Sequence, residues 1–352
     1  MWKVAFFFFV SLLPVAAIAD QVGFKQITLS NSDTRNLEAA IWYPTQMTSH
    51  QDYVGGNKAF VGVPVWRDAP PAPGHHPLLL LSHGYGGSWR NLNWLAQSMA
   101  AQGYIVAAPD HPGTTTRDRN PDDAARLWLR PMDLNQLMDQ LINQPATAGE
   151  VDETRIAAMG HSLGGWTVME LAGARFDPQQ FIADCRQRPQ LSDCKLTSTL
   201  GIDTPLAQEN LRSPLRNSHI KAVVSLDLGL ARGFTQKSLA AIHLPVLVLS
   251  AQTDSSELPA SIESGYLAQS IPQRWVRFIR VPGATHFSFM QLCQPDGQAL
   301  IEASSPGDGI VCMDETGFTR QQIHQSVMTM VSGFLNASLN YPPAGTPLVS
   351  SR

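Results

Sequence analysis

Several short stretches of this chain are apolar at every position, a pattern typical of strands buried on both faces. The four leucines at 78–81 and the Val-Leu-Val-Leu run at 246–249 show it most clearly. A strand without a polar face has to be covered on both sides, as in a parallel sheet with helices above and below it. The pattern therefore favours an α/β fold.

Strand-like and helix-like segments alternate along the rest of the chain, which predicts a mostly parallel central sheet flanked by crossover helices. Strands are predicted at 37–43, 77–82, 104–108, 155–160, 221–227, 245–250 and 274–281. Helices are predicted at 91–102, 131–143, 163–173, 259–270 and 319–335.

Three segments stand apart from this alternation. Residues 1–19 combine Lys3, an apolar run of about ten residues and an Ala-Ile-Ala end, which predicts a secretory signal peptide. We expect an exported protein, periplasmic or secreted, with no transmembrane segment after cleavage. Residues 20–340 then form one domain, in which the polar stretch 175–217 is a predicted cap-like insertion. The Pro- and Ser-rich stretch 341–352 predicts a flexible tail.

The predicted export suggests that the four cysteines form disulfides, because disulfides persist in oxidising compartments. Cys185 lies close to Cys194 in the sequence, and Cys293 lies close to Cys312. Four cysteines allow three connectivities, of which these two local pairs are the simplest. Each small loop closed in this way stabilises the fold by roughly 3 kcal/mol.

The charge balance argues against nucleic acid as a partner. The formal net charge is −4, and no long basic run is present. The spacing of cysteines and histidines does not match a zinc site. We therefore expect neither a metal nor an organic cofactor.

The segment 160–164, Gly-His-Ser-Leu-Gly, matches a Gly-x-Ser-x-Gly pattern in which a strand turns sharply into a helix. The apolar residues before it predict a strand, and those after it predict a helix. Glycine at both flanks lets the backbone pass closely and leaves the hydroxyl of Ser162 exposed at the bend. Ser162 is the predicted nucleophile.

A serine hydroxyl needs a base to take its proton, and the base needs an acid to orient it. His286 follows the last predicted strand on a glycine-containing loop, so it is the predicted base. Two aspartates follow strands in the order Ser, acid, His. We favour Asp254, after the strand at 245–250, and keep Asp227, after the preceding strand, as the alternative.

The oxyanion of an acyl-transfer intermediate needs two backbone N–H donors. One is expected from Leu163, the residue after the nucleophile. The other is expected from Tyr85, in the glycine-rich loop Ser-His-Gly-Tyr-Gly-Gly at 82–87 that follows an early strand.

Taken together, these segments resemble the α/β-hydrolase superfamily. The resemblance rests on the segments 83–86, 110–113, 160–165, 244–246 and 283–287 and on Asp254. Within the superfamily, the chain resembles bacterial predicted dienelactone hydrolases, which are related to platelet-activating-factor acetylhydrolases and polyester-cleaving cutinases. In cutinase-type esterases the acid stands at the position of Asp254, whereas in the acetylhydrolases it stands at that of Asp227. True dienelactone hydrolases use a cysteine nucleophile, so Ser162 leaves the substrate open.

We therefore expect an exported hydrolase of carboxylic esters that works through an acyl-enzyme intermediate. Small-molecule, lipid and polyester esters all remain candidate substrates. One rival is a phospholipase A2 or acetylhydrolase-like lipid hydrolase with Asp227 as its acid. Another is a non-catalytic binding protein on the same fold.

Overall fold

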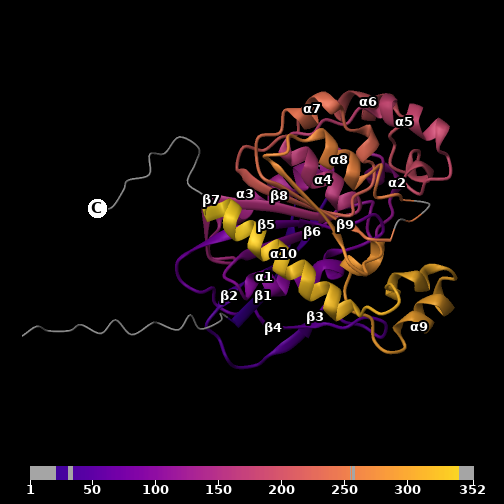
Figure 1. The fold of residues 1–352 in the computed structure, drawn as a ribbon. Coiled ribbons are helices and arrows are strands. Elements are labelled where there is room, and N and C mark those ends of the chain that lie inside the picture. The colour runs from indigo at the N-terminus through magenta and orange to yellow at the C-terminus, as the bar shows by residue number, and fades with distance from the viewer. Residues whose placement is uncertain (1–20, 31–34, 254, 256–257, 341–352) are drawn as a thin grey trace, which may run out of the picture.

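A computed structural model describes residues 21–30, 35–253, 255 and 258–340 (Figure 1). The predicted signal peptide at 1–19, the predicted acid Asp254 and the predicted tail at 341–352 lie outside the described residues.

A ten-stranded sheet forms the centre of the molecule, in the order β10-β9-β8-β7-β5-β6-β2-β1-β4-β3. The strands are β1 (Gln21–Leu29), β2 (Leu37–Thr45), β3 (Asp52–Val54), β4 (Val63–Arg67), β5 (His75–Ser82), β6 (Ile105–Asp110), β7 (Glu150–His161), β8 (Ile220–Leu226), β9 (Val246–Ala251) and β10 (Val276–Val281). The six strands from β10 to β6 run parallel, whereas β2 pairs antiparallel with both β6 and β1. The predicted mostly parallel sheet is confirmed.

Helices cover both faces of this sheet (Figure 1). They are α1 (Asn93–Ala100), α2 (Pro121–Ala124), α3 (Leu129–Asn143), α4 (Leu163–Ala172), α5 (Pro178–Gln187), α6 (Pro205–Asn210), α7 (Gln236–Ala240), α8 (Ser264–Ser270), α9 (Gly297–Ser304) and α10 (Arg320–Asn340). Buried side chains of α3, α4 and α8 share one apolar cluster with the sheet, and those of α1 and α10 share the other. No helix in the described ranges is long and apolar enough to cross a membrane.

The apolar runs noted in the sequence lie where burial on both faces requires them. In β5, Leu78 and Leu80 belong to one cluster, and Leu79 and Leu81 belong to the other. All four side chains are almost completely buried. Successive side chains of a strand point to opposite faces, so a strand between two helical layers needs an apolar residue at every position.

The seven predicted strands and five predicted helices are all present, with shifted ends. The largest shifts are of five residues: β7 begins at Glu150 and not at 155, α10 ends at Asn340 and not at 335, and α8 begins at Ser264 and not at 259, because residues 260–263 form a turn. Residues 175–217 contain α5, the 3₁₀ turn η2 (Cys194–Leu196) and α6, and they contain no strand. The cysteines pair locally, Cys185 with Cys194 and Cys293 with Cys312.

Candidate active site

The predicted nucleophile lies on a strained turn between β7 and α4. Ser162 has φ 55° and ψ −120°, a conformation that non-glycine residues rarely adopt. The flanking glycines make this turn possible. A Cβ at Gly160 would lie 2.1 Å from the carbonyl oxygen of Gly164, and a Cβ at Gly164 would lie 1.9 Å from that of Ser82. Such strain is typical of residues held in place for a function.

The predicted base lies within hydrogen-bonding distance of this serine. His286 opens the 3₁₀ turn η4 (His286–Phe289), shortly after β10. Its Nε2 lies 3.1 Å from Oγ of Ser162, and its Nδ1 lies 2.7 Å from Oδ2 of Asp227. With Nδ1 donating to the carboxylate, Nε2 is free to accept the serine proton.

Asp227, the alternative acid, is the carboxylate that contacts the predicted base, and the favoured Asp254 lies outside the described residues. It directly follows β8, and only 4% of its surface is exposed. Its Oδ1 accepts a hydrogen bond from the backbone N–H of Ala251 at 2.8 Å, which leaves Oδ2 directed at His286. Nδ1 carries a single proton, so a second acid has no hydrogen bond to accept there. In the loop of Asp254, the described residues Gln252 and Thr253 are exposed.

A second histidine, which the sequence analysis did not single out, packs against the base. His161 directly precedes the nucleophile; its ring centroid lies 4.7 Å from that of His286. Its Nε2 donates to the backbone carbonyl of His286 at 2.8 Å. Burial, reinforced by repulsion from His286, lowers the pKa of His161 to about 3. It is therefore neutral at ordinary pH and places no charge beside the base.

The two expected oxyanion donors belong to segments that meet at Ser162. Leu163 is the first residue of α4, so no carbonyl of that helix accepts from its N–H. Gly84 lies against the nucleophile, and a Cβ there would stand 3.1 Å from Cβ of Ser162. The carbonyl of Gly84 accepts from Nδ1 of His83 at 2.7 Å and from the N–H of Gly87 at 3.1 Å. The carbonyl of Gly84 and the backbone N–H of Tyr85 belong to the same peptide group.

Behind the loop that contains the expected donor Tyr85 lies a second Ser-His-Asp arrangement, which the sequence analysis missed. Nε2 of His111 lies 2.9 Å from Oγ of Ser82, and its Nδ1 lies 2.8 Å from Oδ2 of Asp133. All three are buried, and burial lowers the pKa of His111 well below its usual range. No substrate can reach a serine buried in this way, so the arrangement supports the loop. The segment at 110–113 contains His111, but sequence spacing alone does not show what it contacts.

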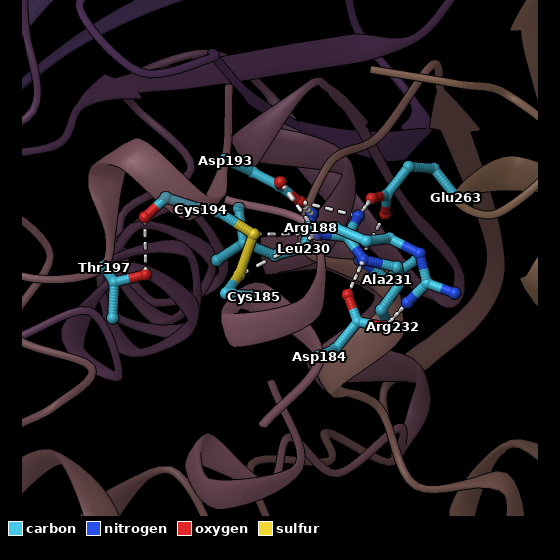
Figure 2. The surroundings of a disulfide bond; sticks show 10 residues. All are labelled: Asp184, Cys185, Arg188, Asp193, Cys194, Thr197, Leu230, Ala231, Arg232 and Glu263. Atoms are coloured by element: carbon cyan, nitrogen blue, oxygen red, sulfur yellow. Dashed lines mark hydrogen bonds and ion pairs between the residues drawn. A yellow bond between two sulfur atoms is a disulfide. The ribbon is translucent and has the colours of Figure 1, made fainter. Parts of the chain in front are cut away.

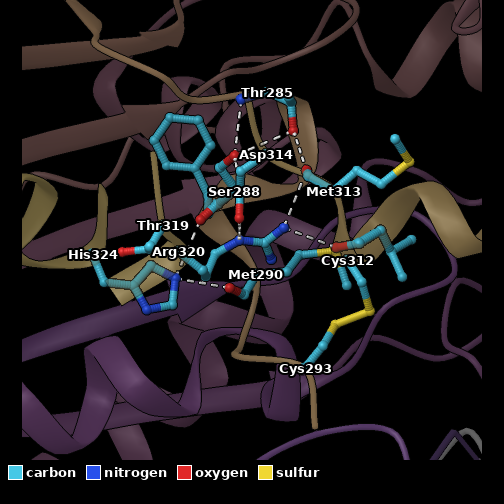
Figure 3. A network of polar contacts seen from close by, with 12 residues as sticks. Thr285, Ser288, Met290, Cys293, Cys312, Met313, Asp314, Thr319, Arg320 and His324 are labelled. Carbon is cyan, nitrogen blue, oxygen red and sulfur yellow. Dashed lines mark hydrogen bonds and ion pairs between the residues drawn. A yellow bond between two sulfur atoms is a disulfide. The ribbon is translucent and has the colours of Figure 1, made fainter. Parts of the chain in front are cut away.

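The turn that carries the predicted base contacts the two residues that directly follow Cys312, which is bonded to Cys293 (Figure 3). Oγ1 of Thr285 donates to the carbonyl of Met313 at 3.1 Å, and Oγ of Ser288 donates to Asp314 at 2.5 Å. Asp314 also pairs with the buried Arg320 at 2.8 Å. The turn of His286 is therefore braced by the segment that this disulfide anchors.

The other disulfide lies beside the loop that follows Asp227 (Figure 2). Asp193, next to Cys194, accepts from the N–H of Leu230 at 3.0 Å and pairs with Arg232 at 2.9 Å. Glu263 accepts from the N–H of Ala231 at 2.7 Å. The buried side chain of Arg232 also pairs with Glu263 and Asp184.

Comparison with known families agrees with this architecture. The model of the alpha/beta hydrolase family matches residues 78–300. The chain belongs to the alpha/beta hydrolase family. A second model, of platelet-activating factor acetylhydrolase isoform II, matches residues 29–120.

Curated relatives match a shorter part of this hydrolase. Cutinase 2 of Thermobifida cellulosilytica is 35% identical over 99 residues, which cover 28% of this chain and 34% of that protein. Bis(hydroxyethyl) terephthalate hydrolase of Streptomyces coelicolor is 27% identical over 116 residues, covering 33% of this chain and 34% of that protein. The matches thus span about a third of these relatives' length.

Among solved structures, the fold is similar along nearly its whole length to a ferulic acid esterase from Streptomyces cinnamoneus. The TM-score is 0.64 and the sequence identity is 21%, with 97% of this chain and 95% of that chain covered. Because the sequence identity is below 25%, this similarity shows a shared fold alone.

Proposed function

We propose that this hydrolase cleaves carboxylic esters through an acyl-enzyme intermediate formed on Ser162. The observation that carries the proposal is the chain of contacts from Oγ of Ser162 to Nε2 of His286 and from Nδ1 of His286 to Asp227. The similarity to cutinases and to a terephthalate-ester hydrolase supports the ester as the substrate bond.

The roles follow from the chemistry of each group. Oγ of Ser162 attacks the ester carbonyl while Nε2 of His286 takes its proton and later gives it to the leaving alcohol. Asp227, in place of the initially favoured Asp254, orients the imidazole and stabilises its protonated form. The N–H groups of Leu163 and Tyr85 bind the developing oxyanion, and each is worth about 10²–10³ in rate. Water then repeats the sequence on the acyl-enzyme.

Two substrate classes are supported by different observations. The cutinase relatives favour small or polymeric carboxylic esters. A short-chain phospholipid ester is the second candidate, because the acetylhydrolase model matches residues 29–120 and Asp227 stands where that group has its acid. We rank the plain ester first, since the curated matches are to ester-cleaving enzymes of that type.

We also propose that the protein is exported. Its two local disulfides need an oxidising compartment to persist, and both brace loops of the proposed site. Secretion can be followed by fractionating cells that express the full chain. Cytoplasmic retention of the disulfide-free protein would contradict the proposal.

The acid assignment is tested by a matched pair of aspartate variants. Asp227→Asn should lower kcat for a nitrophenyl ester by about 10⁴-fold, as loss of the orienting carboxylate does in other triads. Asp254→Asn is the control and should lower kcat far less. The reverse ranking would return the acid to Asp254.

The reaction class is tested by covalent labelling and by a substrate panel. A fluorophosphonate should label the wild-type chain and leave Ser162→Ala unlabelled; an unlabelled wild-type protein would support a non-catalytic binding role. Nitrophenyl esters of increasing chain length, run beside a short-chain phospholipid, separate the two substrate classes. Preference for the phospholipid would move the assignment to the lipid hydrolase.

A further inference from the structure

A buried arginine lies between the two segments that carry the proposed oxyanion donors. Arg130 belongs to α3, and only 2% of its surface is exposed. On one side its guanidinium donates to the carbonyl oxygen of His83, two residues before Tyr85. On the other side its Nε donates to Oγ1 of Thr167 at 3.0 Å, one turn of α4 beyond Leu163.

The contact with α4 extends to the first donor. Oγ1 of Thr167 donates its own proton to the carbonyl of Leu163 at 3.0 Å. Arg130 thereby holds Thr167 in the orientation that fixes the first turn of this helix. The N–H of Leu163 stands at the opening of that same turn.

The contact with the loop extends to the second donor. Arg130 donates to the carbonyl oxygen of His83. The imidazole of His83 accepts a hydrogen bond at Nε2 from the backbone N–H of His111 at 3.0 Å. That contact places the proton of the neutral ring on Nδ1, which donates to the carbonyl of Gly84 at 2.7 Å. The N–H and C=O of a trans peptide point in opposite directions. With the carbonyl of Gly84 bound on one side, the N–H of Tyr85 is directed to the other.

Among the described residues, no carboxylate forms an ion pair with Arg130. Within the described part of the chain, its hydrogen bonds run to hydroxyl and carbonyl oxygens, including Thr114 at 2.5 Å and Ser82 at 3.2 Å. The nearby Asp133 is bound instead by Arg35 and His111. Burial lowers the pKa of Arg130 to about 9, which leaves it protonated at neutral pH. A positive charge in a region of low dielectric favours the formation of negative charge close by.

We propose that Arg130 is a positioning residue for the oxyanion hole: it fixes the Tyr85 and Leu163 segments relative to each other and adds positive charge behind them. The inference rests on the ester hydrolysis proposed above. Arg130 does not touch the substrate, so its effect should appear in the transition state and not in substrate binding.

The test compares three variants with the wild-type enzyme. Arg130→Met removes both the bridge and the charge. Thr167→Val leaves Arg130 in place and removes only the link to α4, and it serves if the first variant does not fold. Leu137→Ala is the matched control, because this fully buried residue of the same helix packs in the apolar core and its side chain makes no hydrogen bond.

Each preparation is first titrated with a fluorophosphonate, so that rates refer to reactive Ser162 and not to total protein. The readouts are kcat and KM for a nitrophenyl ester and the Kd of a trifluoromethyl ketone. Oγ of Ser162 bonds to the ketone carbon and its proton passes to His286, which leaves an oxyanion in the hole. The Kd of this adduct therefore reports oxyanion binding.

Arg130→Met should lower kcat about 10²-fold and raise the Kd of the ketone by the same factor, with KM changed less than about twofold. Thr167→Val should lower kcat about tenfold, the worth of one hydrogen bond. Leu137→Ala should lower thermal stability while kcat per titrated site stays unchanged.

The inference is overturned if Arg130→Met and Thr167→Val both keep the wild-type kcat and ketone affinity. It is also overturned if Leu137→Ala loses as much kcat per titrated site as Arg130→Met. Failure of the proposed function gives a different result. If the wild-type protein is labelled by the fluorophosphonate but hydrolyses no ester, the ester is not its substrate. The ketone affinities of the variants still decide the role of Arg130.

Discussion

The fold should lose stability steeply in mild acid because one imidazole on α10 is held neutral. Nε2 of His324 faces the carbonyl oxygens of Ser288 and Met290 at 3.2 and 2.9 Å. Its ring stacks on Trp94 with 3.5 Å between the centroids (the ring and its carbonyl partners are visible in Figure 3). Burial, reinforced by repulsion from Arg320, lowers the pKa of His324 from 6.5 to about 3.

The magnitude follows from the two pKa values. The unfolded chain binds a proton at His324 near pH 6.5, whereas the folded chain does so only near pH 3. The stability that the neutral ring contributes is therefore complete above this window and is lost as the pH falls through it. Between about pH 7 and about pH 4.5, this single residue accounts for a loss of about 2.5 kcal/mol in the free energy of unfolding.

His324→Gln tests this value, since glutamine can donate to the same carbonyls but does not titrate. Urea unfolding followed by circular dichroism at the two pH values gives the free energy of unfolding for each protein. The wild-type chain should lose about 2.5 kcal/mol more than the variant between them. Equal losses would mean that His324 is protonated in the folded protein, and the reasoning from burial would be refuted.

Two further predictions concern stability and the support of the site. Glu170, buried in α4, has its pKa raised well above the usual range by burial, so Glu170→Gln should be more stable than wild type at alkaline pH. The gap should close as the pH falls toward 4.5, where the unfolded glutamate also becomes protonated; a constant gap in thermal melts would contradict this. Replacing Cys293 and Cys312 by serine should lower kcat more than it changes KM, because the turn of His286 loses its stapled support. An unaltered kcat in a folded double variant would show that the hydrogen bonds alone hold the turn.

The sequence predicts the parallel part of the sheet better than the end formed by β1, β4 and β3, for a physical reason. Strands covered on both faces need apolar residues at every position, so the apolar runs of β5 and β9 are visible in the sequence. At the β3 end of the sheet, β1 mixes buried and exposed positions, and β3 has three residues. The short helices α6 and α7 contain too few turns to display a period. These elements depend on tertiary contacts that the local sequence does not record.

The proposed site divides in the same way. The turn around Ser162 has local requirements, met by Gly160 and Gly164, and these are visible in the sequence. The acid has no such signature, because Asp227 and Asp254 both follow neighbouring parallel strands. The choice between them depends on how each strand end is oriented toward His286, which is a three-dimensional property.

The disulfide of Cys293 and Cys312 lies downstream of the whole sheet in the sequence, and the turn of His286 contacts the residues that directly follow it (Figure 3). A newly made chain can thus assemble its sheet and its nucleophile turn before this bond forms. Until oxidation the turn of His286 would lack this brace and would be held by the contacts of His286 with Asp227 and His161. Under the proposed export and ester hydrolysis, we therefore expect full activity only after the chain has reached an oxidising compartment.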